Sequence, residues 1–160
     1  MNLSQLDQLS FLRRNRLPVI LQSEAAECGL ACLAMVATYW GHRIDIAAIR
    51  NRYSVSLKGT TLAALITVAR GMKLQTRPLK LDMHHLRNLQ LPCILHWNLN
   101  HFVVLKSLTI NEAIIHDPAI GERRVGLADV SNHFSGIALE LHPTSDFKKK
   151  KKYEKFRFFH

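Results

Sequence analysis

The sequence contains no long hydrophobic run and few cysteines, and each shortage excludes a class of protein. No stretch approaches the roughly 18 apolar residues of a transmembrane helix, and no G-x-x-x-x-G-K-[ST] segment that would bind nucleotide phosphates occurs. The N-terminus also lacks the apolar core of a secretory signal ahead of a small-residue cleavage site. We therefore expect a chain that itself neither spans a membrane nor binds a nucleotide.

The cysteines are three, Cys28, Cys32 and Cys93, an odd number without the spacing of a disulfide scaffold. Such usage is typical of a reducing, cytosolic setting. Zinc is an alternative, because Cys93-x-x-His96 and Cys28-x-x-x-Cys32 offer thiolate and imidazole ligands. Neither pair has the tight knuckle spacing of structural zinc sites, so we expect no metal and no other cofactor. The remaining histidines show no pattern of partners.

The net charge of +10 is concentrated at one end of this 160-residue chain. Residues 146–160 carry seven Lys or Arg against two acidic residues, which is half of the total charge. Clustered lysines attract nucleic acid or acidic lipid, but no folded stretch interleaves basic residues with the aromatics that nucleic-acid binding surfaces use. A nucleic-acid adaptor would therefore depend on this tail alone, and we expect no nucleic-acid partner. The length predicts one domain with short appendages.

The segment from Gln22 to Tyr39 carries the best candidate nucleophile, Cys28. After this cysteine, apolar positions recur at three- and four-residue steps, at Ala31, Cys32, Met35, Val36 and Tyr39. The pattern predicts a helix to about Trp40, ended by Gly41. Cys28 would then lie in the first helical turn, where free backbone N–H groups and the helix dipole lower a thiol pKa from about 8.5.

Gln22 lies six positions before Cys28, with only small and acidic residues between them. A short loop can fold its amide back beside the thiol. Its carboxamide N–H and the backbone N–H of Cys28 would then form an oxyanion hole for a tetrahedral intermediate. The alternative is that Cys28 is an ordinary buried cysteine and Gln22 a surface loop residue.

The rest of the chain predicts an α+β fold in two lobes, with helices first and strands later. We expect an N-terminal helical lobe, an antiparallel sheet in the C-terminal lobe, and the active site in the cleft between them. The helical patterns cover 45–53, a helix capped by Thr60 or Thr61 that ends at 71, and 82–89, capped by Asp82. The strand patterns cover 73–79, 93–97, 102–108, 112–116 and 136–141. A short amphipathic helix over 2–12 would belong to an N-terminal arm over residues 1–16.

Two residues of the predicted sheet complete a candidate site. His101 opens a strand just after the Asn98–Asn100 turn, and Asp117 ends the next strand before Pro118. A histidine held by a carboxylate can exchange a proton with a thiol and later protonate a leaving amine. From composition alone, the alternative that both are ordinary strand-end and turn residues stays open.

Three runs together resemble the cysteine peptidase domain at the N-terminus of bacteriocin-exporting ABC transporters, especially the colicin V type. They read Q-S-E-A-A-E-C-G-L-A-C-L-A-M, then L-P-C-I-L-H-W-N-L-N-H-F-V-V-L, then H-D-P-A-I-G. The resemblance implies a papain-like peptidase domain over 17–143 and a basic linker over 144–160. It also implies Cys28 as the nucleophile, His101 as base and then acid, Asp117 as the residue that orients His101, and Gln22 as the oxyanion donor.

The resemblance implies a cysteine endopeptidase that removes a leader peptide after a Gly-Gly motif before the mature peptide is exported. Its partners would be a precursor peptide and the transmembrane and nucleotide-binding domains of a transporter, outside this chain. It would act on the cytoplasmic side of the bacterial inner membrane. The alternative is a non-catalytic peptidase-like domain that only docks substrate. Such domains have lost the cysteine, so the presence of Cys28 argues against it.

Overall fold

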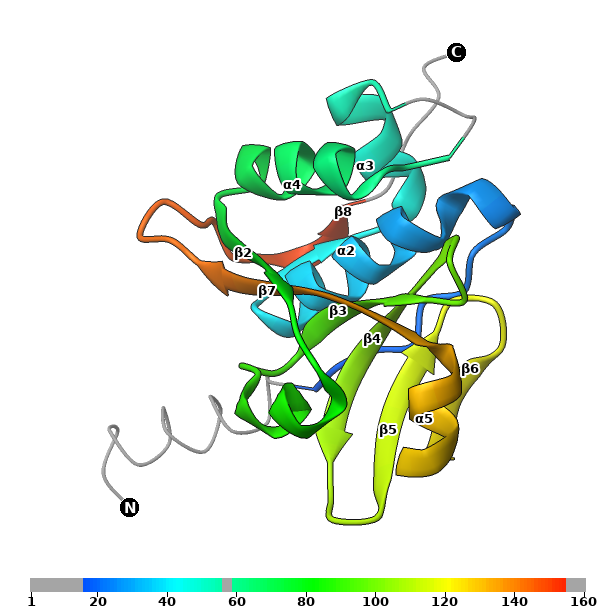
Figure 1. The fold of residues 1–160 in the computed structure, drawn as a ribbon. Coiled ribbons are helices and arrows are strands. Elements are labelled where there is room, and N and C mark those ends of the chain that lie inside the picture. The colour runs from blue at the N-terminus through cyan, green and yellow to red at the C-terminus, as the bar shows by residue number, and fades with distance from the viewer. Residues whose placement is uncertain (1–15, 56–58, 155–160) are drawn as a thin grey trace, which may run out of the picture.

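The computed structural model describes residues 16–55 and 59–154, and its main feature is a six-stranded antiparallel sheet (Figure 1). The strand order is β2-β7-β3-β4-β5-β6. The strands are β2 (Leu74–Lys80), β3 (Cys93–Trp97), β4 (His101–Leu108), β5 (Glu112–Asp117), β6 (Gly121–Gly126) and β7 (Phe134–Pro143). The predicted α+β class, with early helices and a later antiparallel sheet, is confirmed. The helix predicted over 2–12 lies outside the described residues.

Three helices precede most of the sheet: α2 (Cys28–Tyr39), α3 (Ile46–Tyr53) and α4 (Leu62–Gly71). The side chain of Asp45 caps α3 by accepting the Ala48 N–H at 2.8 Å, and Thr61 caps α4 by accepting the Ala64 N–H at 3.1 Å. None of the helices in the described ranges is long and apolar enough to cross a membrane.

The short helix predicted over 82–89 is the 3₁₀-helix η2 (Met83–Asn88). Asp82 occupies the predicted N-cap position, but its side chain accepts no capping hydrogen bond, so the prediction is right in position and wrong in the contact. A six-residue 3₁₀ turn exposes few backbone donors, so its start depends less on a cap than an α-helix does.

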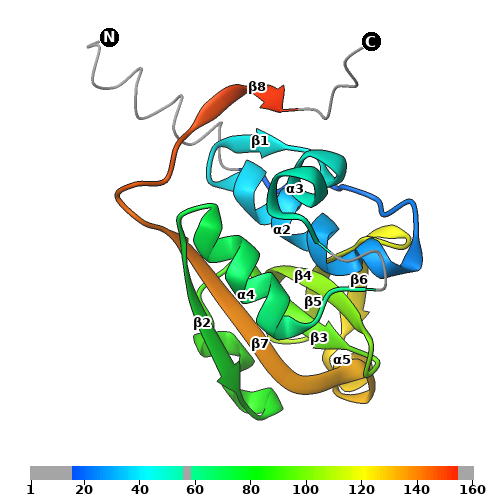
Figure 2. The same cartoon turned by 90° about the horizontal axis from the view of Figure 1, so that it is seen from above.

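The central strands of the sheet, β3 and β4, are buried on both faces. One face packs against α2 and α4, with α3 lying against α2, and the other face is covered by η2 and by α5 (Leu127–His133), as Figures 1 and 2 show. Neighbouring residues of one strand enter different cores: Val104 of β4 packs toward α2, whereas Val103 packs toward η2 and α5. Strands with two buried faces have near-continuous apolar sequences instead of alternating ones. This explains the run from Phe102 to Leu105.

Several elements were not predicted from the sequence. They are the 3₁₀-helix η1 (Ala25–Glu27), β1 (His42–Ile44), β6, α5 and β8 (Lys150–Glu154). β1 and β8 form a parallel pair beside α2 and α3 (Figure 2). β6 reads G-E-R-R-V-G and β8 reads K-K-K-Y-E, so neither shows the hydrophobic signal of a strand. Part of the segment predicted as a basic linker, residues 150–154, is thus a strand in this structure.

Candidate active site

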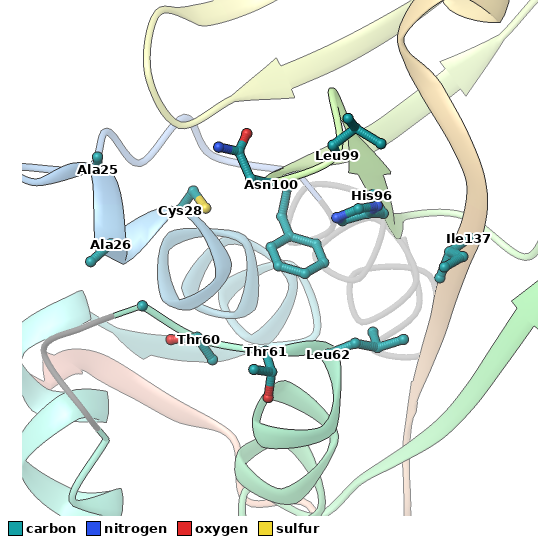
Figure 3. Close-up of a pocket in the computed structure, with 12 residues that line it drawn as sticks. Ala25, Ala26, Cys28, Thr60, Thr61, Leu62, His96, Leu99, Asn100 and Ile137 are labelled. Atoms are coloured by element: carbon teal, nitrogen blue, oxygen red, sulfur yellow. The ribbon is translucent and has the colours of Figure 1, made fainter.

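A pocket of about 660 Å³ opens beside the N-terminus of α2. Figure 3 shows its walls: the start of α2 on one side, the segment that leads into α4 on another, and the β3–β4 turn opposite. Its lining residues come from these three regions, from the 3₁₀-helix before α2, and from β3, β4 and β7: Ala25, Ala26, Cys28, Gly59, Thr60, Thr61, Leu62, His96, Leu99, Asn100, Phe102 and Ile137. The sulfur of Cys28 faces this space in Figure 3.

Cys28 is the first residue of α2, directly after the 3₁₀-helix η1 (Ala25–Glu27), and its side chain is 6% exposed. Burial is the largest single influence and would raise the pKa of this thiol. Hydrogen bonds from His101 and from the backbone N–H groups of Phe102 and Gly29, with the positive charge of His101, outweigh burial and lower the Cys28 pKa. The predicted thiolate is therefore favoured. The sequence predicted a helix-terminus N–H but missed the donor from Phe102.

The pKa values of the other two thiols are raised instead of lowered. Burial raises the pKa of Cys32 well above its ordinary value, and the charge of Cys28 adds to this effect. Burial also raises the pKa of Cys93, with a contribution from Glu140. Both side chains are fully buried, so Cys32 is a core residue as the helical pattern indicated.

His101 and Asp117 meet across two neighbouring strands. His101 begins β4 and Asp117 ends β5, and the His101 Nε2 atom lies 2.7 Å from Asp117 Oδ1. The hydrogen bond to Asp117, followed by the hydrogen bond to Cys28, raises the pKa of His101 to about 9. Since Nε2 bonds the carboxylate, Nδ1 is the nitrogen left for the thiol. Cys28, His101 and Asp117 are thus joined in one hydrogen-bonded series, the thiol–imidazole–carboxylate line. Its charges favour a thiolate–imidazolium pair.

The turn after β5 holds Asp117 in place. Its Oδ1 atom also accepts the Ala119 N–H at 2.9 Å, and Gly121 closes the turn at φ +101°, a conformation that favours glycine. Burial would raise the pKa of Asp117, but hydrogen bonds from His101 and Ala119 outweigh it and lower this pKa. Asp117 is therefore ionised and fixed before any substrate binds.

The turn before His101 is held by His133, a residue distant in the sequence. Asn98 and Leu99 adopt positive φ angles of 51° and 69°. The Asn98 N–H donates to the His133 carbonyl at 2.9 Å, and Nδ1 of His133 lies 2.6 Å from Oδ1 of Asn98. Leu99 is left 86% exposed at the rim of the pocket. The sequence assigned His133 no role, and no local signal indicated this contact.

Gln22 lies beside the same turn as Asp117. Its backbone N–H donates to the Pro118 carbonyl at 2.8 Å. The Oε1 atom of Gln22 is buried and accepts no hydrogen bond from any described residue. No described protein group therefore fixes the carboxamide through its oxygen. The structure thus brings Gln22, Cys28, His101 and Asp117 into one region.

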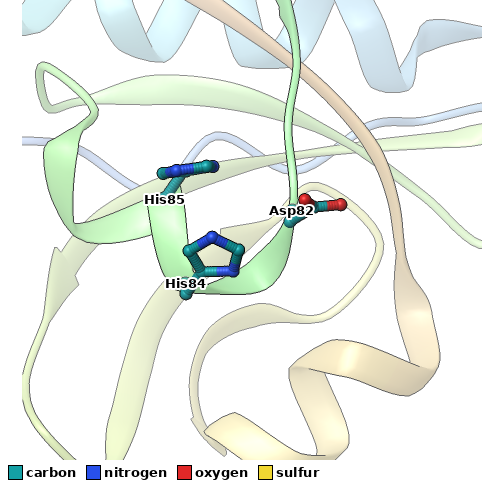
Figure 4. A group of neighbouring side chains, drawn as sticks. All are labelled: Asp82, His84 and His85. Atoms are coloured by element: carbon teal, nitrogen blue, oxygen red, sulfur yellow. The ribbon is translucent and has the colours of Figure 1, made fainter.

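One group of described residues whose side chains could hold a metal ion lies elsewhere. Asp82, which directly precedes η2, and His84 and His85 on η2 have side-chain O or N atoms within 4.8 Å of one another, and all three side chains are exposed (Figure 4). None of them lines the pocket at Cys28. This group therefore has no part in the chemistry of that pocket.

The fold and the thiol–imidazole–carboxylate line define a papain-like cysteine peptidase. Residues 16–146 match the Peptidase C39 family, and the chain belongs to that family. It is 45% identical over 142 residues to the probable microcin-H47 secretion/processing ATP-binding protein MchF of Escherichia coli, covering 89% of this chain and 20% of that protein. It is also 45% identical over 147 residues to the colicin V secretion/processing ATP-binding protein CvaB of Escherichia coli, covering 91% and 21%. The chain thus spans about a fifth of the length of these relatives.

Solved structures show the same fold. A double glycine motif protease from an AMS/PCAT transporter, in complex with the leader peptide, superposes with a TM-score of 0.76 at 37% identity, covering 82% of this chain and 94% of that one. The peptidase domain of Streptococcus ComA, a bifunctional ABC transporter, gives a TM-score of 0.73 at 27% identity, covering 81% and 100%. The predicted family and the papain-like fold are confirmed.

Proposed function

We propose that this chain is the domain that removes the leader from the precursor of an exported peptide, cutting directly after a Gly-Gly motif. The observation that carries the proposal is the Cys28–His101–Asp117 line beside an open pocket. The similar peptidase solved with a leader peptide supports the substrate class.

The first half of the reaction uses the charges already present. The thiolate of Cys28 attacks the carbonyl carbon of the second Gly, and the carbonyl oxygen becomes an oxyanion. The Gln22 carboxamide and the backbone N–H of Cys28 donate hydrogen bonds to that oxygen; removing one such donor typically costs about 3 kcal/mol. The imidazolium of His101 then protonates the amine as the C–N bond breaks, which leaves a thioester on Cys28.

The second half restores the enzyme. Neutral His101 removes a proton from a water molecule, which attacks the thioester carbon. The C–S bond breaks, the leader leaves with its new carboxylate, and the Cys28 thiolate again pairs with the protonated His101. Asp117 keeps the ring oriented through Nε2 and stabilises its positive charge in both halves.

The pocket suits a substrate that is narrow at the cut and apolar beyond it. Glycine has no Cβ, so its backbone can pass between the walls at Cys28. Two glycines offer little binding surface and lose much backbone entropy, so affinity must come from elsewhere in the leader. Leu62, Leu99, Phe102 and Ile137 supply apolar lining for the hydrophobic side of an amphipathic helix.

The long relatives set the wider context of the proposal. We place this domain in a membrane transporter, on the cytoplasmic side of the bacterial inner membrane, together with transmembrane and nucleotide-binding domains. Residues 1–16 would form an arm, 17–143 the peptidase, and 144–160 the connection to the membrane domain, although its residues 150–154 form β8 and pair with β1 of the peptidase. Lysine-rich flanks are common on the cytoplasmic side of membrane spans.

The test is to incubate this chain with a precursor peptide that carries a Gly-Gly leader and to follow the products by mass spectrometry. We expect one cut directly after the second Gly, and none with Cys28→Ser. Binding of the leader without any cleavage by the unmodified chain would instead identify a docking domain. Cleavage by Cys28→Ser at the unmodified rate would reject the assigned nucleophile.

A further inference from the structure

We infer that Glu27 is a positioning residue that fixes Gln22 at the oxyanion hole, an inference that rests on the proposed peptidase function. Glu27 immediately precedes Cys28 and is only 5% exposed. A buried carboxylate beside a nucleophilic thiol is unfavourable unless other groups compensate its charge. The groups that do so here belong to the segment that follows Gln22 and to α3.

The carboxylate of Glu27 binds the chain on the C-terminal side of Gln22. Its Oε1 atom accepts the backbone N–H groups of Ser23 at 3.1 Å and Glu24 at 2.8 Å. These are the two residues directly after Gln22. The Oε2 atom pairs with the guanidinium of Arg50 on α3. Hydrogen bonds that involve ionised groups are the stronger ones, so Glu27 joins this segment firmly to the start of α2.

A second set of contacts holds the chain on the N-terminal side of Gln22. The Gln22 N–H donates to Pro118, in the turn after Asp117. Nδ1 of the buried His116 lies 2.8 Å from the Pro18 carbonyl oxygen. These contacts anchor residues 18–22 to β5 and its turn, whereas Glu27 anchors residues 23 and 24 to the helix that bears Cys28. Gln22 is the residue where the two anchors meet.

Loss of Glu27 would release only one of these anchors. The Ser23 and Glu24 N–H groups would lose their acceptor, and the residues between Gln22 and Cys28 could adopt other conformations. The thiol would keep its hydrogen bonds to His101 and to the backbone of Phe102. We therefore expect Glu27→Ala to misplace the Gln22 carboxamide while the Cys28 thiolate persists.

The experiment is a double-mutant cycle of Glu27→Ala and Gln22→Ala, measured on a Gly-Gly leader peptide. Loss of one oxyanion donor lowers kcat by about 100-fold to 1,000-fold. A residue that acts only through Gln22 should not lower kcat by more than this. We expect Glu27→Ala to lower kcat by about tenfold to 100-fold with KM nearly unchanged, and to cause less than about a twofold further loss when Gln22 is already Ala. Glu27→Gln, which keeps Oε1 as the acceptor, should retain most of kcat.

Two controls separate positioning from general damage. Glu112→Ala removes a partly exposed Glu112–Arg124 pair at 3.7 Å, on β5 and β6 and outside the pocket at Cys28, and should leave kcat and the reactivity of Cys28 unchanged. The rate at which iodoacetamide modifies Cys28 should be the same in Glu27→Ala and the unmodified chain. An equal loss of kcat from Glu27→Ala with and without Gln22 would overturn the inference, as would a matching loss of Cys28 reactivity.

Hydrogen exchange of backbone amides tests the role of Glu27 without any enzymatic turnover. Amide exchange at Ser23 and Glu24 should speed up at least tenfold in Glu27→Ala and stay slow in Glu27→Gln. If the unmodified chain cuts no leader peptide, the proposed function fails, and this exchange still decides whether Glu27 fixes the segment. Unchanged exchange at both residues in Glu27→Ala would refute the positioning role even if the enzyme is active.

Discussion

The charge of Asp117 should set the alkaline limit of activity, and Asp117→Asn tests this directly. The pKa of His101 is raised from 6.5 to about 9, first through its hydrogen bond to Asp117 and then through its hydrogen bond to Cys28. Asparagine keeps an oxygen that can accept from His101 and Ala119 but removes the negative charge. Since an opposite charge at this range shifts a pKa by about 1–3 units, the His101 pKa should fall from about 9 to about 6–8.

The size of the effect depends on pH in a way that identifies its cause. With a pKa of about 9, nearly all His101 is imidazolium at pH 7, and most of it remains so at pH 8.5. With a pKa of about 7, roughly half is imidazolium at pH 7 and only a few per cent at pH 8.5. The loss of kcat/KM from this cause should therefore be about twofold at pH 7 and about 20-fold at pH 8.5.

The assay is the pH profile of kcat/KM on a Gly-Gly leader peptide, with the pH dependence of iodoacetamide inactivation beside it. Asp129→Asn is the matched control, because it removes one negative charge from the exposed surface of α5 and should leave the profile unchanged. An alkaline limb that stays near pH 9 in Asp117→Asn would refute the view that this carboxylate sustains the imidazolium.

Four further outcomes follow from the same contacts. Cys32→Ala should leave cleavage intact and lower the free energy of unfolding in urea by about 1–2 kcal/mol. In the folded unmodified protein, iodoacetamide should label Cys28 and leave Cys32 unmodified. Selective labelling of Cys32 would contradict the assigned nucleophile. Because folding raises the His101 pKa from 6.5 to about 9, protonated His101 stabilises the fold fully below pH 6.5, and this contribution is lost as the pH rises through about 9. In His101→Ala, the melting temperature should therefore vary less with pH across this window. Gly121→Ala, at φ +101°, should cost about 1–2 kcal/mol, whereas Gly126→Ala, with no atom within 4 Å of the added Cβ, should cost little. A leader whose final Gly is replaced by Val should be cut far more slowly with little change in binding, and efficient cutting would show that the pocket is not narrow at Cys28.

The sequence by itself determined the elements whose signals are local. The spacing of apolar residues after Cys28 predicted α2 and placed the thiol in its first turn, as the structure shows. The helical pattern over 45–53 predicted α3, and Thr61, one of the two candidate caps, marks the start of α4 because a cap acts within three residues of its own position. The apolar runs of β3 and β4 were also visible, since a strand buried on both faces needs such residues throughout.

Only the tertiary structure decided which of these residues meet. His101 and Asp117 are 16 positions apart and become neighbours because β4 and β5 pair in antiparallel register. β6 and β8 are rich in charged residues, so their strands depend on pairing with β5 and β1 and not on hydrophobic periodicity. Glu27 is one of the acidic residues between Gln22 and Cys28 in the sequence, and only the fold brings Arg50 to its carboxylate. Contacts of this kind depend on loop closure and burial across distant segments, and no local pattern in the chain records them.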